Sequence, residues 1–257
     1  MISAQFLTGL NPGGTAMAWF FTENEIIGDS LTISGENAKH IKVLRMKPGE
    51  SLTLVTPGGT QCECELVSYD SDCASVKVVS KKPCRNEPDI EITLYQALPK
   101  SDKMDFIIQK SVELGVSKIV PMISERCVSC PDEKSLEKKR IRWQKIALQA
   151  AMQSRRGTIP EVCPCVSFEK AVELSRRNEK NIFFYEMGGE AVNKLLTEAP
   201  KTVGIFIGSE GGFSPGEAKL AKENNAPAAT LGRRILRAET APLAAITIIM
   251  YQTGNFD

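Results

Sequence analysis

From about residue 90 onward, short β-rich apolar runs alternate with stretches of helical periodicity, and this rhythm limits the fold more than any other feature. Two runs, Ile182–Tyr185 and Val203–Ile207, have the composition of strands that are buried on both faces. A helix is predicted to begin at Ser101 or Asp102 and to end at Gly115. The alternation predicts a mostly parallel sheet covered by helices, with strands expected at 90–95, 118–122, 181–186, 203–207 and 228–231.

The preceding part of the chain has a different pattern. Residues 51–55, 61–67 and 74–79 alternate apolar and polar side chains, and the first two runs are joined through Pro57-Gly58-Gly59. This pattern predicts a small β-barrel or sandwich. The polar segment Pro83–Pro88 predicts a domain boundary, which gives a barrel over 18–86 and an α/β domain over 87–257. Residues 1–17 are expected to be a disordered leader or tag.

The composition excludes several classes of protein. Hydrophobic residues make up 42% and charged residues 25%, which are globular values, and no apolar run reaches the roughly 18 residues of a membrane span. Eight cysteines in a long chain without an export signal predict reduced thiols and a cytoplasmic location. Cys127-x-x-Cys130 with Cys163-x-Cys165 leaves zinc as an alternative, but the expectation is no metal.

The formal net charge is only +1, so any signal for a nucleic-acid partner must be local. Residues 99–156 contain 13 basic and 7 acidic side chains, a local charge of +6. Two interpretations stay open for this excess, a solvated helix face and a surface that contacts phosphates. The basic residues concerned are Lys134, Lys138, Lys139, Arg140, Arg142 and Lys145, followed by Arg155 and Arg156.

The segment from Ile207 to Glu217 combines a strand end, a glycine-rich turn and a helix start. Ser214 and Glu217 have the spacing of a capping box, with Pro215 at the first helical position. Glycines let the backbone approach a ligand closely, although a tight strand-to-helix turn would use them too. The segment does not fit the P-loop or dinucleotide motifs. Because Glu210 adds a negative charge, a neutral or cationic ligand suits the turn better than a phosphate.

The segment from Leu231 to Leu243 precedes an apolar run that ends at Met250. Thr240 or Ala241 is expected to start a final helix, with Pro242 in its first turn. Because this helix is apolar all round, it requires cover from its own domain or from a second subunit. The loop before it concentrates Arg233, Arg234, Arg237 and Glu239 at the expected carboxyl edge of the sheet, where open α/β sheets bind ligands.

With Phe184–Glu186, these two segments resemble the three cofactor-binding motifs of SPOUT-class methyltransferases. The whole chain from about Trp19 is similar to the bacterial 16S ribosomal RNA (uracil-N3)-methyltransferases of the RsmE type. The further segments that carry this resemblance are His40–Arg45 with Lys47–Gly49, Gln96–Met104, Gln109–Gly115, and Gln153–Arg156 with Ile159-Pro160.

The resemblance implies an N-terminal PUA-like β-barrel, an α/β domain with a C-terminal trefoil knot, a homodimer, and methylation of uridine N3 in 16S ribosomal RNA or the small ribosomal subunit. It implies S-adenosylmethionine as cofactor and no membrane partner. The candidate catalytic residues are Arg237 for anion stabilisation, with Glu239 or Glu210 for proton acceptance or sulfonium-side electrostatics. The candidate cofactor-binding residues are Tyr185, Gly208, Gly211, Leu231, Gly232, Ile235, Leu236 and Leu243, and the candidate RNA-binding residues are Arg45, Lys100, Lys103 and Arg156.

Two other functions stay open on the residues alone. A non-catalytic RNA-binding protein would share the barrel and the basic face, but it would not need the glycine turn and the arginine segment together. A phosphate-ligand enzyme of the doubly wound class would use the helix N-terminus after Gly212 as an anion site.

Overall fold

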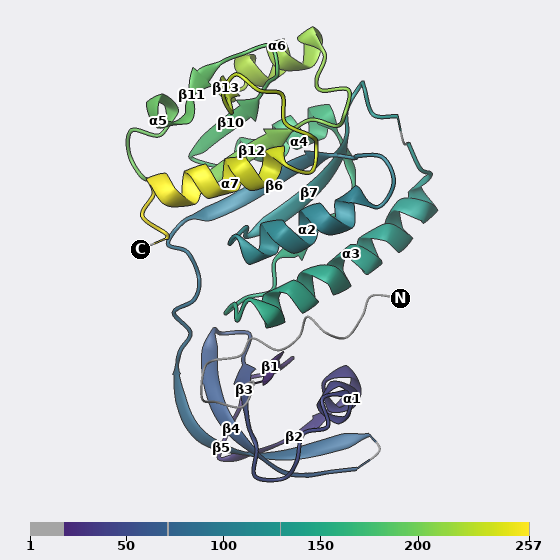
Figure 1. Cartoon of the computed structure of the whole chain (residues 1–257), viewed down its shortest axis with the longest axis vertical. Helices are drawn as coiled ribbons and strands as arrows, with labels where there is room; N and C mark the ends of the chain where they lie inside the picture. The colour runs from purple at the N-terminus through teal and green to yellow at the C-terminus, as the bar shows by residue number, and fades with distance from the viewer. Residues whose placement is uncertain (1–17, 71, 129, 257) are drawn as a thin grey trace. The chain divides into compact units, whose positions relative to one another are not determined.

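The computed structural model describes residues 18–70, 72–128 and 130–256. The leader expected at 1–17 lies outside these residues. The chain divides into two compact units (Figure 1). The N-terminal unit ends at Glu87 and also includes Ala151–Thr158, and the α/β unit consists of Pro88–Ala150 and the chain from Ile159 onward. The segment Ala151–Thr158, which was expected within the second domain, therefore groups with the first unit.

The N-terminal unit contains a five-stranded sheet in the order β1-β3-β4-β5-β2. β1 pairs with β3 in parallel, and the other pairs are antiparallel. The described pairings leave β1 and β2 at opposite edges, so the expected barrel is an open half-barrel. Its apolar interior includes Phe20, Ile41 and Leu54, all fully buried. The elements are β1 Ala18–Phe21, β2 Ser30–Ser34, α1 Gly35–Val43, β3 Ser51–Val55, β4 Thr60–Tyr69 and β5 Cys73–Pro83.

The α/β unit contains an eight-stranded sheet, and its strand pairs are all parallel, as the sequence predicts. The order is β11-β13-β10-β12-β6-β7-β8, with β9 beside β7. All five predicted strands are present, to within a few residues at their ends. The strands are β6 Glu91–Ala97, β7 Lys118–Ile123, β8 Glu161–Val162, β9 Val166–Ser167, β10 Lys180–Phe184, β11 Glu190–Ala191, β12 Thr202–Ile207 and β13 Ala228–Thr230.

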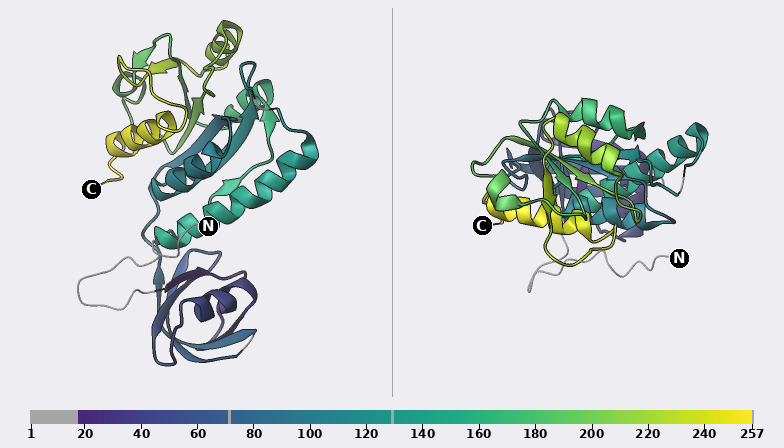
Figure 2. Two further views of the ribbon diagram at one scale, coloured as in Figure 1. Left: turned by 45° about the vertical axis from the view of Figure 1, so that its right-hand side comes forward. Right: turned by 90° about the horizontal axis from the view of Figure 1, so that it is seen from above.

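Helices pack on both faces of this sheet (Figure 2). α2 contacts α7 on one face, and α4 contacts α6 on the other. Beneath α4 and α6, Phe168, Phe183, Phe206 and Phe213 form an aromatic cluster, and the Tyr95 ring stacks on Phe206 with 4.6 Å between centroids. The helices are α2 Lys103–Glu113, α3 Glu133–Gln153, α4 Phe168–Ser175, α5 Val192–Leu195, α6 Pro215–Glu223 and α7 Ala241–Gln252. Among the helices of the described residues, none is long and apolar enough to cross a membrane.

The final helix, α7, begins after Thr240 with Pro242 in its first turn, as predicted. Its own unit covers only one side of it. Ala245, Ile246 and Ile249 are fully buried, whereas Ile248 is 36% exposed and Tyr251 is 74% exposed. The other side of α7 therefore presents apolar surface that the residues described in the structure leave exposed.

Candidate functional site

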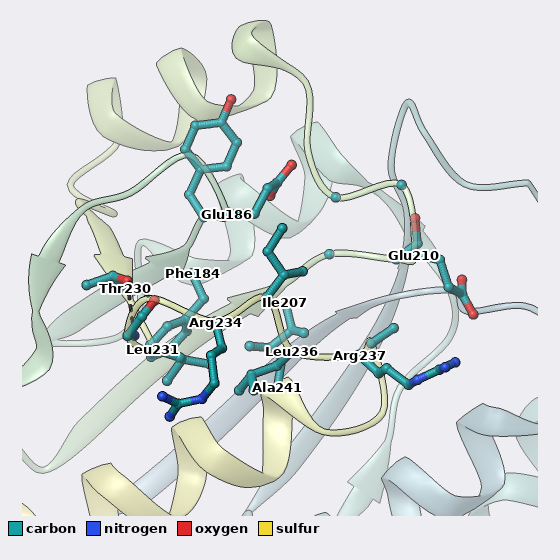
Figure 3. A pocket seen from close by; sticks show the side chains of 18 of the residues that line it. Phe184, Glu186, Ile207, Glu210, Thr230, Leu231, Arg234, Leu236, Arg237 and Ala241 are labelled. Carbon is teal, nitrogen blue, oxygen red and sulfur yellow. Dashed lines mark hydrogen bonds between the residues drawn. The ribbon is translucent and has the colours of Figure 1, made fainter.

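A cavity of about 480 Å³ lies at the carboxyl ends of β10, β12 and β13 (Figure 3). Its volume is within the range of small-molecule sites, and its position is where open α/β sheets bind ligands. Three segments and Lys103 provide most of the lining. The segments are Phe184–Glu186 from the end of β10, Ile207–Gly212 from the end of β12, and Ala229–Ala238 from β13 onward, and Ala241 completes the wall.

The three glycines of residues 208–214, here called the glycine turn, leave little room for a Cβ atom. A Cβ on Gly212, which has φ +66°, would lie 2.1 Å from the Glu186 carboxylate. A Cβ on Gly211 would lie 3.0 Å from the Arg126 carbonyl oxygen, and one on Gly208 would lie 3.1 Å from the Gly212 backbone. The glycines therefore allow backbone to form the cavity wall.

Hydrogen bonds hold the glycine turn from outside the cavity. Gly212 N donates to Ser209 O at 3.0 Å, which closes the turn. The Ser209 hydroxyl donates to Arg126 O at 3.3 Å, and Arg126 Nη1 donates to Gly211 O at 3.2 Å. Gln96 Nε2 adds a long bond to Gly208 O at 3.4 Å. The segment after β7, which contains Arg126, therefore supports this wall.

The predicted capping box at the start of α6 is present. Ser214 Oγ accepts from Glu217 N at 3.2 Å, and Glu217 Oε2 accepts from Ser214 N at 2.8 Å. The second oxygen of Glu217 accepts from Glu125 N at 2.9 Å. Glu217 is 7% exposed, so a buried carboxylate joins α6 to the segment after β7. The capping box therefore uses the N–H groups of Ser214 and Glu217, which an anion at this helix N-terminus would otherwise find free.

Residues 231–240, here called the arginine loop, form the opposite wall and are held by fewer bonds. Thr230 Oγ1 accepts from Gly232 N at 3.1 Å and lies 3.2 Å from Gly232 O, and Gly232 has φ +102°. Within the described part of the chain, the backbone of Arg233–Leu236 has no hydrogen-bond partner. Ile235 is 85% exposed although it lines the cavity.

Lys103, the first residue of α2, lies between these two walls. Its Nζ is 2.9 Å from Glu210 Oε1 in the glycine turn and 3.0 Å from Glu239 Oε2 in the arginine loop. Lys100 N also donates to both oxygens of Glu210, at 3.2 Å. The two carboxylates raise the pKa of Lys103 above its ordinary value. The ammonium is therefore charged at neutral pH.

The two carboxylates are stabilised in their ionised form. Burial alone would raise the pKa of Glu210, but Lys103 and the backbone N–H groups of Glu210 and Lys100 bring it below its ordinary value. The pKa of Glu239 is lowered by its own backbone N–H, against the effect of burial, and further by Lys103 and Arg237. A carboxylate with a lowered pKa is a weak proton acceptor.

The structure brings most of the predicted site residues together. Leu243 is the exception among the predicted cofactor residues, because it lies in the first turn of α7 and outside the cavity lining. Glu239 also lies outside the lining, but it pairs with Lys103, which is part of it. The predicted residues that line the cavity are Tyr185, Gly208, Glu210, Gly211, Leu231, Gly232, Ile235, Leu236 and Arg237.

The four predicted RNA-binding residues have different surroundings. Arg45, with φ +54°, and Lys100 are exposed, whereas the side chain of Lys103 is held by two carboxylates. Arg156 is only 3% exposed, and its Nε donates to Glu87 Oε1 at 3.1 Å. Glu87 also accepts from Gly157 N at 2.7 Å. Because its guanidinium is buried in this ion pair, Arg156 is placed to stabilise the N-terminal unit and not to contact phosphates.

The basic residues of α3 are partly neutralised. Arg140 pairs with Glu137, and Arg142 pairs with Asp105 of α2. The exposed cations that remain include Lys134, Lys138 and Lys145. A surface that could contact phosphates is therefore smaller than the sequence indicates.

The zinc alternative finds no support in the thiols. The cysteines of the described residues are free, and no cluster there could hold a metal ion. Burial raises the pKa of Cys163 to about 11 and that of Cys165 to about 12. In the metal-free structure these two thiols are protonated at neutral pH.

Sequence reasoning missed several residues of the site. Arg126 follows β7 and supports the glycine turn, and Thr230 fixes the start of the arginine loop. The sequence placed Glu186 in one of the cofactor-binding motifs but assigned it no role. In the structure, its carboxylate lies against Gly212. The only signal for Arg126 was its place directly after a predicted strand, at the edge where the glycine turn was also expected.

Comparisons with known proteins agree with this geometry. Residues 85–250 match the family described as RNA methyltransferase domain, and residues 33–79 match the RNA methyltransferase PUA domain. A ribosomal RNA small subunit methyltransferase E from Bacillus subtilis is 35% identical over 87% of this chain and 91% of its own length.

Solved structures of methyltransferases are also similar over nearly the whole chain. A ribosomal RNA small subunit methyltransferase E from Neisseria gonorrhoeae, bound to S-adenosyl methionine, has a TM-score of 0.84 and 33% identity over 92% of this chain and 98% of its own. A methyltransferase from Legionella pneumophila, in complex with the same cofactor, has a TM-score of 0.86 and 29% identity over 93% of this chain and 98% of its own. With a PUA domain, a methyltransferase domain and a cavity formed by the predicted loops, this chain belongs to the RNA methyltransferase family.

Proposed function

We propose that this chain transfers a methyl group from S-adenosylmethionine to N3 of a uridine in small-subunit ribosomal RNA. The observation that carries the proposal is the cavity between the glycine turn and the arginine loop, in a chain whose relatives are ribosomal RNA small subunit methyltransferases. The uridine and its N3 position are the finer part of the proposal, and they rest on the motif resemblance.

The residues of the cavity fit S-adenosylmethionine. The glycine turn is a cradle that a Cβ would fill, so backbone groups can approach the cofactor directly. Glu210 and Glu239 have lowered pKa values, and their ionised carboxylates suit a cationic ligand. When bound, the cofactor supplies an electrophilic methyl group on a sulfonium centre. The residues proposed to hold it are Tyr185, Gly208, Gly211, Leu231, Gly232, Ile235 and Leu236.

The charged side chains divide into two roles. Uracil N3 becomes a good nucleophile only as its proton leaves, so a base or a cation that stabilises the uracil anion is required. We assign anion stabilisation to Arg237, which lines the cavity. Glu210 and Glu239 have lowered pKa values and are weak bases, so we assign them to electrostatic stabilisation of the cofactor and not to proton acceptance.

The RNA is proposed to contact exposed cations of both units. Arg45 follows α1 within the N-terminal unit, and Lys100 precedes α2. Within the α/β unit, α3 adds the exposed side chains of Lys134, Lys138 and Lys145. Phosphate contacts make affinity depend on salt, so filter binding across a salt series should give a steep slope in wild type and a shallower slope in Lys134→Ala/Lys138→Ala.

Three further properties are proposed with this function. The chain forms a homodimer, since the exposed side of α7 presents Ile248 and Tyr251 to solvent. Its C-terminal segment forms a trefoil knot, and the protein acts in the cytoplasm. Light scattering should report a dimer at micromolar concentration that Ile248→Glu weakens. A wild-type monomer under those conditions would contradict the dimer.

The deciding experiment is mass-spectrometric nucleoside analysis of small-subunit ribosomal RNA from cells that lack the protein. N3-methyluridine should be absent and should return with the wild-type gene but not with Arg237→Ala. Calorimetry with S-adenosylhomocysteine separates the alternatives, because a purely RNA-binding protein would not bind it. Unchanged N3-methyluridine in the deletion strain would contradict the proposed reaction.

A further inference from the structure

The two walls of the cavity belong to distant parts of the sequence, and Lys103 is placed to join them. Glu210 follows β12, and Glu239 precedes α7. The Lys103 ammonium contacts both carboxylates, at 2.9 and 3.0 Å. All three side chains are 23–29% exposed, so this ion-pair triad is partly shielded from water. The lysine comes from a third element, α2, whose position is fixed by the buried residues Met104, Ile107 and Ile108.

The triad is electrostatically asymmetric. One ammonium faces two carboxylates, so loss of the cation would leave two negative charges that repel each other at close range. The Glu239 Oε2 atom in contact with Lys103 is buried, and it would then lose its ion-pair partner. Glu210 would still accept from Lys100 N. The arginine loop is therefore the wall that depends more on Lys103.

We propose that Lys103 is a positioning residue that ties the arginine loop to the glycine turn and so sets the width of the cofactor cavity. This inference rests on the proposed function and deepens it. It also replaces the expectation that Lys103 grips RNA. A phosphate could take the ammonium only by displacing two carboxylates that already hold it.

The test compares Lys103→Met with a matched lysine of the same helix. Lys110 also forms an ion pair, with Glu113 at 2.8 Å and 36% side-chain exposure, but it is not part of the cavity lining. Calorimetry with S-adenosylhomocysteine should show affinity at least tenfold weaker in Lys103→Met and unchanged in Lys110→Met. Lys103→Arg, which keeps the charge, should recover most of the loss. Methyl-transfer kinetics should show a rise in KM for S-adenosylmethionine that exceeds the fall in kcat.

A second comparison tests whether Lys103 acts through the two carboxylates. In a Glu210→Gln/Glu239→Gln background, Lys103→Met should cause less than a threefold further loss of affinity, because the charges it balances are gone. Melting temperatures of all variants identify any that fail to fold. If Lys103→Met does not fold, Glu239→Gln alone, which releases only the arginine loop, should still weaken binding several-fold.

The outcomes separate this inference from the proposed function. A wild-type protein that binds no S-adenosylhomocysteine would overturn both. Equal affinity in wild type and Lys103→Met would overturn the inference alone. The inference would also be overturned if Lys103→Met still lowered S-adenosylhomocysteine affinity tenfold in the Glu210→Gln/Glu239→Gln background. A shallower salt slope of RNA binding in Lys103→Met, with unchanged S-adenosylhomocysteine affinity, would return Lys103 to the RNA surface.

Discussion

The glycine turn and the arginine loop form opposite walls of one cavity, but they are built differently. The glycine turn is closed by its own backbone bond, supported by Arg126 and followed by the capping box of Glu217. The arginine loop leaves the described backbone of Arg233–Leu236 without partners and exposes Ile235. One wall is therefore preorganised for a ligand, whereas the other has unused donors and acceptors that a ligand can satisfy.

This difference predicts different roles for the two walls in cofactor binding. A preorganised wall binds without loss of conformational entropy, and a loosely held wall loses entropy when it closes over the ligand. The glycine turn should therefore determine whether the cofactor binds at all. The arginine loop should adjust affinity and place Arg237 for the reaction. Substitutions in the two walls should differ accordingly.

The largest effect is expected in the preorganised wall. In Gly211→Val, the Cβ would lie 3.0 Å from the Arg126 backbone, and the two γ-methyl groups would crowd the turn further. Binding of S-adenosylhomocysteine should fall more than a hundredfold by calorimetry. Gly216→Val is the control, because the nearest atom to its Cβ would be Ser214 Oγ at 3.7 Å. Similar affinities for the two variants would remove the glycine turn from the cofactor site.

A smaller effect is expected where the preorganised wall is anchored. Glu217→Gln places an NH₂ group where one of the Ser214 and Glu125 N–H groups now donates to a carboxylate oxygen. A lost bond to a buried charged acceptor costs about 2 kcal/mol. The melting temperature should fall by a few degrees, and cofactor affinity should fall by less than in Gly211→Val. An unchanged melting temperature would show that this buried carboxylate does not anchor the wall.

The residues in these two predictions illustrate which features of the site can be predicted from the sequence. The capping box and the glycine turn were predictable because their residues are neighbours in the chain, and the apolar runs predicted every main strand of the α/β unit. The hydrogen bond by which Arg126 supports the glycine turn could not be predicted, because it joins residues 85 positions apart in the sequence. Arg156 was assigned to RNA from the family resemblance, whereas its partner Glu87 lies 69 residues away. Interactions between neighbouring residues can be predicted from the sequence. Side-chain contacts between distant segments cannot, because they depend on the three-dimensional arrangement of the strands and loops.

In the arginine loop, Gly232→Ala should have a moderate effect. There is open space around the Cβ position, so only the φ of +102° is unfavourable. Such backbone strain costs about 1–2 kcal/mol, which corresponds to roughly tenfold in affinity. Because the loop is loosely held, the melting temperature should stay within about a degree of wild type. A large fall in melting temperature would show that the arginine loop contributes to the core of the unit.

The smallest effect is expected for Thr230→Val, which keeps the side-chain shape and removes the acceptor of Gly232 N. An exposed hydrogen bond contributes about 0.5–1 kcal/mol. Cofactor affinity should fall less than fivefold, and Thr230→Ser should restore it. A loss as large as that of Gly211→Val would mean that both walls are equally preorganised.

Backbone hydrogen exchange, measured with and without S-adenosylhomocysteine, tests the difference between the walls most directly. The amides of Gly212 and Glu217 donate within the glycine turn and the capping box, so they should exchange slowly in the free protein and change little on binding. The amides of residues 233–236 should exchange rapidly in the free protein and at least tenfold more slowly in the complex. Equal protection of both segments in the free protein, or no slowing of residues 233–236 in the complex, would contradict the account of one preorganised wall and one that closes on the cofactor.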